Sequence, residues 1–473
     1  MRSPTLVLAF ILAACGSATP VPATHAPVDE PAWMQSVRDA QHCAETGAHT
    51  FDHVQGLTDA AGPRLAGSPG DPLAVAWALA HMQEIGLANV HSEPVTVHVW
   101  QRGDEHVEMI APVPHRLAAA ALGGSVGTPP EGIEADVVRV ASLDELRALP
   151  ADQAAGHIVF VDQRMERTRD GSGYGTGVMV RISSASIAAE RGALAVLIRS
   201  VGTDSTRFAH TGVVRYDDAQ PRIPAAAISN ADADVLARTI EGGASVRIRM
   251  TLGCHDAPDA QSANVIGEVV GSDRASEVVL LGAHLDSWDL GRGAVDDGAG
   301  VAIVLEAARQ ISISPTPPRR TVRVVLFANE ENGGAGADAY AAAHASELAS
   351  HVIGMEADFG DGRAWALRTP DAPARTAAWA RVASLLEPMG VVWDAEEPRG
   401  GADIGAMHET GGVPPADVEQ DGTRYFDLHH TANDVLTEID RESLDHAMRA
   451  VMTVAYAAAM DVDGIARVAQ PAP

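Results

Sequence analysis

The stretch 278–286 reads VVLLGAHLD. Its first six residues form a continuous apolar run, which is typical of a strand buried on both faces of a sheet. His284 and Asp286 follow at once, and period-two alternation places both side chains on the same side of the chain. Open α/β folds carry their functional residues at this carboxyl edge. The stretch therefore predicts a central α/β sheet with polar side chains at its edge.

Two further strands are predicted downstream, and acids follow each of them. Residues 321–328 read TVRVVLFA and lead into Glu330 and Glu331. Residues 351–355 lead into Asp358, with Glu356 as an alternative. Because adjacent side chains diverge, one glutamate of the pair can bind a metal while the other stays free as a base. These strand ends add three carboxylates to the same predicted edge.

Asp296 opens the stretch DDGAG at the predicted junction between a loop and the helix 298–310. A carboxylate there can bridge two cations, whereas Asp297 also fits as a charge at a helix N-terminus. His429 and His430 supply imidazoles late in the chain. Two histidines with three carboxylates are typical of catalytic zinc sites, so two Zn2+ ions are predicted. Such a pair can activate a shared water, while a neighbouring carboxylate carries its proton.

The chain is strongly acidic and long enough for more than one domain. Its 473 residues contain 63 Asp and Glu against 34 Lys and Arg, a formal net charge of -29. This charge disfavours nucleic acid and anionic membrane surfaces as partners. The hydrophobic content of 46% supports a large core, and the length fits two domains preceded by a leader.

The N-terminus has the pattern of a bacterial lipoprotein leader. The apolar run 6–14 is too short to span a bilayer and is typical of a signal peptide. The order LAACG at 12–16 then predicts lipidation of Cys15 and a membrane anchor, with an ordinary cleavage site as the alternative. We expect a signal peptide at 1–15, a flexible tether at 16–32, and a location in the bacterial cell envelope, either periplasm or outer membrane.

The predicted pattern of secondary structure changes along the rest of the chain and divides it into two regions. Residues 122–132 are rich in Gly, Pro and Thr, and short predicted strands follow as far as residue 254, with a helix near 184–191. From residue 264 onward strands alternate with helices. We predict an α/β fold with a mixed central sheet flanked by helices, formed by 33–121 and 255–466, and an inserted strand-rich domain at 122–254. Cys43 and Cys254 could form a disulfide or remain free thiols.

The chain resembles the co-catalytic zinc exopeptidases, and among them most the carboxypeptidase Q (plasma glutamate carboxypeptidase) group, in four stretches: 282–289 (GAHLDSWD), 296–300 (DDGAG), 329–331 (NEE) and 430–434 (HTAND). The similarity extends through 62–70, 123–130, 210–212 and 223–226, so it covers nearly the whole mature chain. It implies the zinc exopeptidase fold with an inserted protease-associated-like domain, and a homodimer. It also suggests that 210–212 reaches the substrate cleft. One departure is Asn329, where a small residue is expected.

The resemblance also implies two zinc sites that share a carboxylate: His284, Asp296 and Asp358 would hold one ion, and Asp296, Glu331 and His430 the other. Glu330 would be the general base, and Asp286 would orient His284. His429 stands where some relatives carry a tyrosine that stabilises an oxyanion, and it is a candidate for that role.

The implied function is that of a secreted, lipid-anchored di-zinc exopeptidase that hydrolyses dipeptides or short peptides with a free N-terminus. A metal-bridging hydroxide would attack the peptide carbonyl, with Glu330 as the proton shuttle. An aminopeptidase acting on longer peptides is the alternative, and the length of the cleft would distinguish the two. A non-catalytic receptor-like protein on the same fold would have lost ligands, and a single-zinc acyltransferase would lack part of the second set, whereas here both sets are complete.

Overall fold

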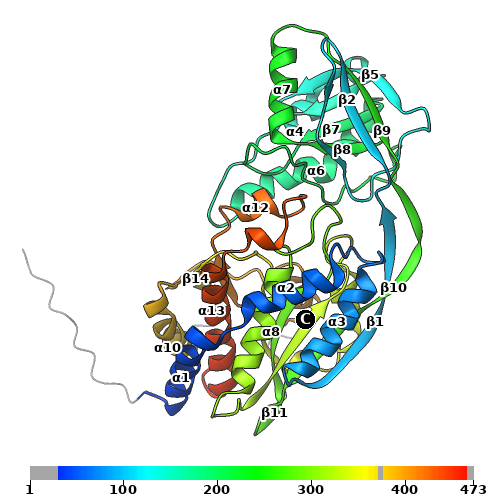
Figure 1. The fold of residues 1–473 in the computed structure, drawn as a ribbon. Helices are drawn as coiled ribbons and strands as arrows, with labels where there is room; N and C mark the ends of the chain where they lie inside the picture. Colours follow the sequence, from blue (N-terminus) through cyan, green and yellow to red (C-terminus); the bar gives the residue numbers. More distant parts are fainter. Residues whose placement is uncertain (1–29, 371–375, 466–473) are drawn as a thin grey trace, which may run out of the picture.

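The computed structural model describes residues 30–370 and 376–465 (Figure 1). The predicted signal peptide with Cys15, and nearly all of the predicted tether, lie outside the described residues. Five strands form the central sheet, in the order β1 (Ala88–Gln101), β10 (His255–Val269), β12 (Arg320–Phe327), β11 (Arg274–His284) and β13 (His351–Glu356). β11 is parallel to β12 and β13, whereas the other pairs are antiparallel. The predicted mixed sheet is confirmed.

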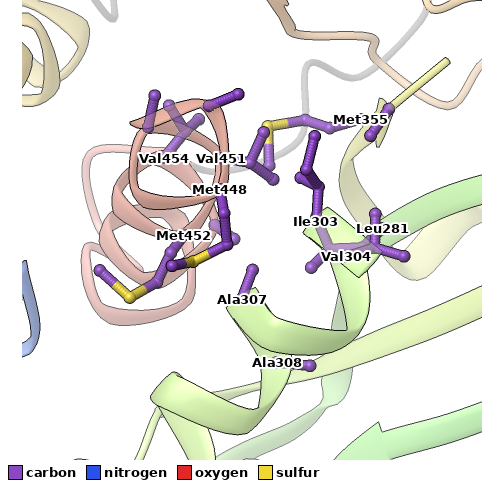
Figure 2. Packing of buried hydrophobic residues seen from close by; sticks show 14 of the residues in the cluster. Leu281, Ile303, Val304, Ala307, Ala308, Met355, Met448, Val451, Met452 and Val454 are labelled. Carbon is purple, nitrogen blue, oxygen red and sulfur yellow. The ribbon is translucent and has the colours of Figure 1, made fainter. Parts of the chain in front are cut away.

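The side chains of β11 alternate between two cores. Val279, Leu281 and Ala283 belong to one apolar cluster, and Leu280 belongs to another on the opposite face. The first cluster includes residues of α1 (Ala32–Gly47), α2 (Thr50–Ala61), α3 (Asp71–Glu84), α8 (Gly298–Ser312), α10 (Thr376–Leu386) and α13 (Arg441–Met460). Figure 2 shows its centre, where Leu281 faces α8 and α13. On the other face lie α9 (Ala335–Ala343) and α11 (Asp403–Gly411).

A second sheet has eight strands, in the order β3 (His115–Arg116), β2 (Glu105–Ala111), β9 (Arg247–Leu252), β5 (Ile133–Val140), β6 (Ile158–Val161), β7 (Ala195–Arg199), β8 (Ala225–Ile228) and β4 (Ala119–Ala121). Its helices are α4 (Leu143–Ala148), α5 (Ala151–Ala154), α6 (Ser172–Glu190) and α7 (Asn230–Glu241). Residues 105–121 join this sheet because β2 pairs with β9 and β4 with β8, although the prediction grouped them with the central sheet. The division into domains remains a prediction.

An antiparallel ribbon carries the chain between the two sheets. β1 and β10 pair along most of their length, from Ala88 opposite Glu268 to Gln101 opposite His255. β2 begins four residues after β1 ends, and β9 ends just before β10 begins. Figure 1 shows this long ribbon rising from the lower sheet to the upper one. The ribbon therefore fixes the side of the central sheet from which the second sheet approaches.

Helix α6 is longer than predicted. It begins at Ser172, whereas the sequence predicted a helix only near 184–191. Its first turns contain Gly173, Gly175 and Gly177, and each glycine lowers helix propensity by about 1 kcal/mol relative to alanine. Close packing explains two of them, because an added Cβ would lie 2.1 Å from Glu166 O at Gly173 and 2.9 Å from a Val201 methyl at Gly177. Tertiary contacts thus override propensity here.

A small three-stranded sheet completes the fold, with the strands β15 (Val392–Trp393), β14 (Ala364–Arg368) and β16 (Asp417–Gln420). The short helix α12 (Tyr425–Leu428) follows it. Cys43 is exposed on α1 and Cys254 is buried after β9, and both are free thiols. Among the described residues, none of the helices combines the length and hydrophobicity that a membrane span needs.

Candidate metal centre

Three parallel strands bring polar side chains to one edge of the central sheet. β11, β12 and β13 run in the same direction, so their carboxyl ends meet. His284 is the last residue of β11, Glu330 and Glu331 follow β12, and Asp358 follows β13. The structure thus brings together the residues that the sequence placed at this edge.

Asp296 lies between the two histidines, just before α8. Its Oδ1 is 3.2 Å from Nε2 of His284, and its Oδ2 is 3.1 Å from Nε2 of His430. Oδ1 of Asp358 lies 3.5 Å from the same His284 nitrogen, and Oε2 of Glu331 lies 3.0 Å from the same His430 nitrogen. The result is two groups of ligand atoms, each within 4.8 Å of one another, that share Asp296.

These donor atoms fit a pair of metal ions. Within the described chain, Oδ2 of Asp296 is buried and accepts no hydrogen bond, even though His430 is close. A buried carboxylate oxygen without a donor is costly unless a cation compensates its charge. Imidazole nitrogens with carboxylate oxygens are the ligands of catalytic zinc sites. The predicted pair of zinc ions is therefore compatible with the residues present.

Crowding raises the pKa of both glutamates after β12. Burial, followed by repulsion from Asp296, raises the pKa of Glu331 to about 7. Burial, together with repulsion from Asp358 and Glu331, raises the pKa of Glu330 well above its usual range, against the opposing influence of His284. Glu330 lines the cleft and belongs to neither ligand group. A carboxylate with a raised pKa is suited to take up a proton and return it.

Asp286 connects His284 to the loop that carries Glu330. Its Oδ1 accepts a hydrogen bond of 3.0 Å from the backbone N–H of Glu330 and lies 3.6 Å from Nδ1 of His284. The backbone oxygen of Asp286 is closer to that nitrogen, at 3.1 Å. A metal-binding imidazole donates its other N–H to such an acceptor, which fixes the nitrogen that faces the metal. Asp286 therefore has the geometry to orient His284, with its main chain as the nearer acceptor.

Two neighbouring acids lie outside the ligand groups and accept hydrogen bonds at the starts of helices. Asp297 caps α8, because it accepts hydrogen bonds from the backbone N–H of Gly300 (3.0 Å) and of His284 (3.1 Å). Glu356 accepts three hydrogen bonds of 2.7–3.0 Å from backbone N–H groups at the start of α11. Both sites place carboxyl oxygens at the positive end of a helix dipole. Asp358, rather than Glu356, belongs to the ligand groups.

His429 is buried at the end of a chain of hydrogen bonds. Nδ1 of His210 lies 2.9 Å from the backbone oxygen of Thr211, which only accepts, so this nitrogen carries the ring hydrogen. Nε2 of a neutral His210 is then an acceptor, 3.2 Å from Nδ1 of His429. A neutral His429 consequently has an acceptor at Nε2, whereas an oxyanion needs a donor. The predicted oxyanion role therefore requires this ring to gain a proton. Burial opposes that gain, because it lowers the pKa of His429 well below its usual range.

Further residues position the ligands although the sequence assigned them no role. The Oη of Tyr425 donates to Oδ1 of Asp358 at 3.1 Å. The Asp434 carboxylate accepts hydrogen bonds from the backbone N–H groups of Val295 (2.6 Å) and Asp296 (3.2 Å), which holds the shared ligand in place. The stretch HTAND contained Asp434, and this was the available signal for it. Nothing in the local sequence singled out Tyr425.

A cleft of about 860 Å³ opens over the ligands. Asp296, Glu330, Asp358 and His430 line one side of it, and residues of α6 such as Arg181 line the other. Figure 1 shows α6 and α12 side by side between the two sheets, where Tyr174 of α6 stacks on Phe426 of α12 with ring centres 4.4 Å apart. The second sheet therefore contributes a wall of the cleft.

Known proteins share both the sequence and the fold. Residues 264–455 match the model of peptidase family M28. Carboxypeptidase Q of Mus musculus is 37% identical over 416 residues, which are 88% of this chain and 86% of that protein. The crystal structure of a peptidase M28 precursor from Shewanella amazonensis has a TM-score of 0.90 and 42% identity, covering 93% of this chain and 99% of that one. The zinc aminopeptidase of Bacillus subtilis has a TM-score of 0.63 at 21% identity, covering 89% and 97%.

The likeness to carboxypeptidase Q spans most of both chains, and the likeness to the Shewanella structure includes both sheets of this fold. The family model covers β11 to α13, the part of the chain that supplies the ligand groups. The predicted resemblance to exopeptidases is thereby confirmed. The chain belongs to peptidase family M28 and is an exopeptidase of the metallopeptidase class.

Proposed function

We propose that this protein hydrolyses dipeptides or short peptides with a free N-terminus, using two zinc ions held by the two ligand groups. One observation carries the proposal. Asp296 offers one carboxylate oxygen to each histidine, and Glu330 lies in the same cleft outside both groups. The similarity to carboxypeptidase Q and to a zinc aminopeptidase supports the reaction class.

The residues divide the chemistry among them. Bound to these ligands, two zinc ions would lower the pKa of a shared water and polarise the scissile carbonyl. Glu330 accepts the proton of the attacking water and returns it to the leaving amine. Asp286 holds the backbone of Glu330 and orients His284, so it positions the base relative to the ligands. His429 is the candidate for stabilising the oxyanion of the tetrahedral intermediate, and only its imidazolium form, which burial disfavours, could donate to it.

The test is hydrolysis of a dipeptide panel by the protein that starts after Cys15, with and without added zinc. Glu330→Gln keeps the shape of the side chain but cannot take up the proton, so kcat should fall at least roughly 100-fold. Zinc content should stay at two ions per chain, because Glu330 belongs to neither ligand group. Glu409→Gln, an exposed substitution on α11, is the matched control and should keep full activity.

Two outcomes would change the assignment. A wild-type protein that binds two zinc ions but cleaves neither dipeptides nor longer peptides would sink the exopeptidase proposal and favour a receptor-like role. Higher kcat/KM on longer peptides than on dipeptides would favour the aminopeptidase alternative. The similarity to the Bacillus zinc aminopeptidase is the reason to test it.

We also infer that the protein is exported, anchored in the bacterial envelope through a lipid on Cys15, and assembled as a homodimer. The support for the anchor is the leader, an apolar run followed by Ala14, Cys15 and Gly16. Cys15→Ala should move the protein from the membrane fraction to the soluble fraction in cell fractionation. An unchanged distribution would exclude the lipid anchor, and sedimentation of the soluble protein tests the dimer.

A further inference from the structure

A buried arginine in the wall of the cleft is paired with no carboxylate of the described residues. Arg181 lies on α6 and is 6% exposed. Its Nη1 donates to Oη of Tyr174 at 2.9 Å and to the backbone oxygen of Thr211 at 3.3 Å, and it lies 3.3 Å from Nδ1 of His430. None of these groups is an anion. Within the described part of the chain, the Nε of Arg181 is buried and makes no hydrogen bond.

Of the four other buried arginines in the described chain, three are paired with carboxylates, whereas Arg64 donates to backbone oxygens. Arg199 donates to Asp162 at 2.7 Å, Arg320 to Glu277 at 2.6 Å, and Arg368 to Glu419 at 2.7 Å. Removing a guanidinium from water is costly unless an anion compensates it. Arg181 differs from these three because it lines the cleft. An anion that arrives through the cleft can therefore serve as its partner.

The position of Arg181 matches one end of a dipeptide. His430 belongs to a ligand group through Nε2 and faces Arg181 through Nδ1, so the guanidinium lies one imidazole ring away from the ligands. The C-terminal carboxylate of a dipeptide lies about 4 Å from the scissile carbonyl, as bond lengths require. A substrate carbonyl at the centre thus brings this carboxylate within reach of Arg181.

Metal binding would also release Arg181 from His430. An imidazole that binds a cation through Nε2 carries its hydrogen on Nδ1, and Nδ1 then cannot accept from a guanidinium. The contact of 3.3 Å between Arg181 and His430 would become one between two donors. Arg181 would then keep two neutral acceptors and gain free N–H groups for an anion.

We propose that Arg181 binds the C-terminal carboxylate of the substrate and so selects dipeptides over longer peptides. The inference rests on the proposed exopeptidase function and deepens it. Guanidinium and carboxylate pair through two parallel hydrogen bonds, whereas the amide that a longer peptide places here is neutral. Because Arg181 comes from α6, the second sheet would determine the length of the substrate.

The experiment compares one dipeptide with its C-terminal amide. For the wild-type protein loaded with zinc, kcat/KM should be at least roughly 100-fold higher for the acid, because a charged hydrogen-bonded pair is lost with the amide. Arg181→Met should lower kcat/KM for the acid by a similar factor and change that for the amide only a few-fold. Arg181→Lys keeps the charge but not the paired donors, so it should retain part of the preference. Arg238→Met, at an exposed arginine on α7 that does not line the cleft, should leave the ratio unchanged.

The outcomes separate this inference from the proposed function. Equal cleavage of acid and amide by the wild type, or an equal loss on both in Arg181→Met, would overturn the role of Arg181 and leave the exopeptidase intact. If Arg181→Met does not fold, the wild-type ratio and Arg181→Lys decide. If a wild type with two zinc ions cleaves neither substrate, the proposed function fails instead. Calorimetry of a free amino acid against its amide, on wild type and Arg181→Lys, then tests the carboxylate contact without turnover.

Discussion

His429 shows how one hydrogen atom limits the role of a residue. His210 directs its own hydrogen to Thr211 and uses that of His429, so a neutral His429 cannot donate to an oxyanion. If His429 acts as an imidazolium, a phenol at this position should replace it as a donor. His429→Tyr should therefore keep most of kcat, whereas His429→Phe should lose roughly 100-fold. Equal losses in the two variants, with two zinc ions bound in both, would show that His429 merely packs beside the centre.

Four of the five predicted ligands had a local signal in the sequence, because His284, Glu331 and Asp358 follow predicted strands and Asp296 precedes a predicted helix. The signal for His284 was the apolar run before it, and the signal for Asp296 was the pair of glycines shortly after it. Asn329, a departure from the expected small residue, has a left-handed backbone with φ 61°, which asparagine tolerates better than most residues. Arg181 and Tyr425 could not be predicted, because packing between distant segments, rather than local pattern, brings them to the cleft.

The loop between β11 and α8 depends on an arginine from elsewhere in the chain. Arg64 is fully buried and donates to the backbone oxygens of Leu285 (2.6 Å), Arg292 (2.9 Å) and Gly293 (2.9 Å). Arg64→Met fills similar space but removes this donor from all three oxygens, and only that of Gly293 keeps another, the N–H of Gly298. The free energy of unfolding should fall by about 3 kcal/mol or more, since each unsatisfied buried group costs about 1–3 kcal/mol. Urea unfolding of the protein without zinc measures the change.

Arg238→Met, at an exposed arginine on α7, is the control and should change stability by less than about 0.5 kcal/mol. Similar small effects in both variants would mean that Arg64 does not hold the loop. The sequence contained Arg64 in the stretch GPRLAG, yet propensity could not reveal its partners. The same limit applied to α6, where the glycines opposed a helix that tertiary contacts stabilise.

At the scale of the whole molecule, two sheets and one ribbon create the cleft. The central sheet supplies the ligand groups, and the second sheet supplies α6 as the facing wall. The alternation of strands and helices predicted the first sheet well, since β11 and β12 are buried on both faces. The arrangement of the second sheet over the centre follows from the pairing of β1 with β10. That pairing joins residues more than 150 positions apart, which no local pattern reveals.

The same core contains a buried acid that should make stability depend on pH. Glu306 of α8 lies 2.9 Å from Nε2 of His53 on α2 and accepts from Arg309 and Gln310. Burial opposes its charge, but these donors prevail and lower its pKa to about 2, from an ordinary 4.5. A carboxyl whose folded pKa is depressed stabilises the fold above its unfolded pKa and loses that contribution as the pH falls toward its folded pKa.

Glu306→Gln should therefore destabilise the protein at pH 7, by an amount on the order of 3 kcal/mol. The difference from wild type should shrink as the pH falls from about 4.5 toward about 2, because the wild type loses its advantage there. Urea unfolding of both proteins without zinc, at pH 7, 5 and 3.5, measures it, with Glu409→Gln as the exposed control. A difference that stays constant across this range would mean that Glu306 stabilises the contact between α2 and α8 by packing, and that its charge has no part in it.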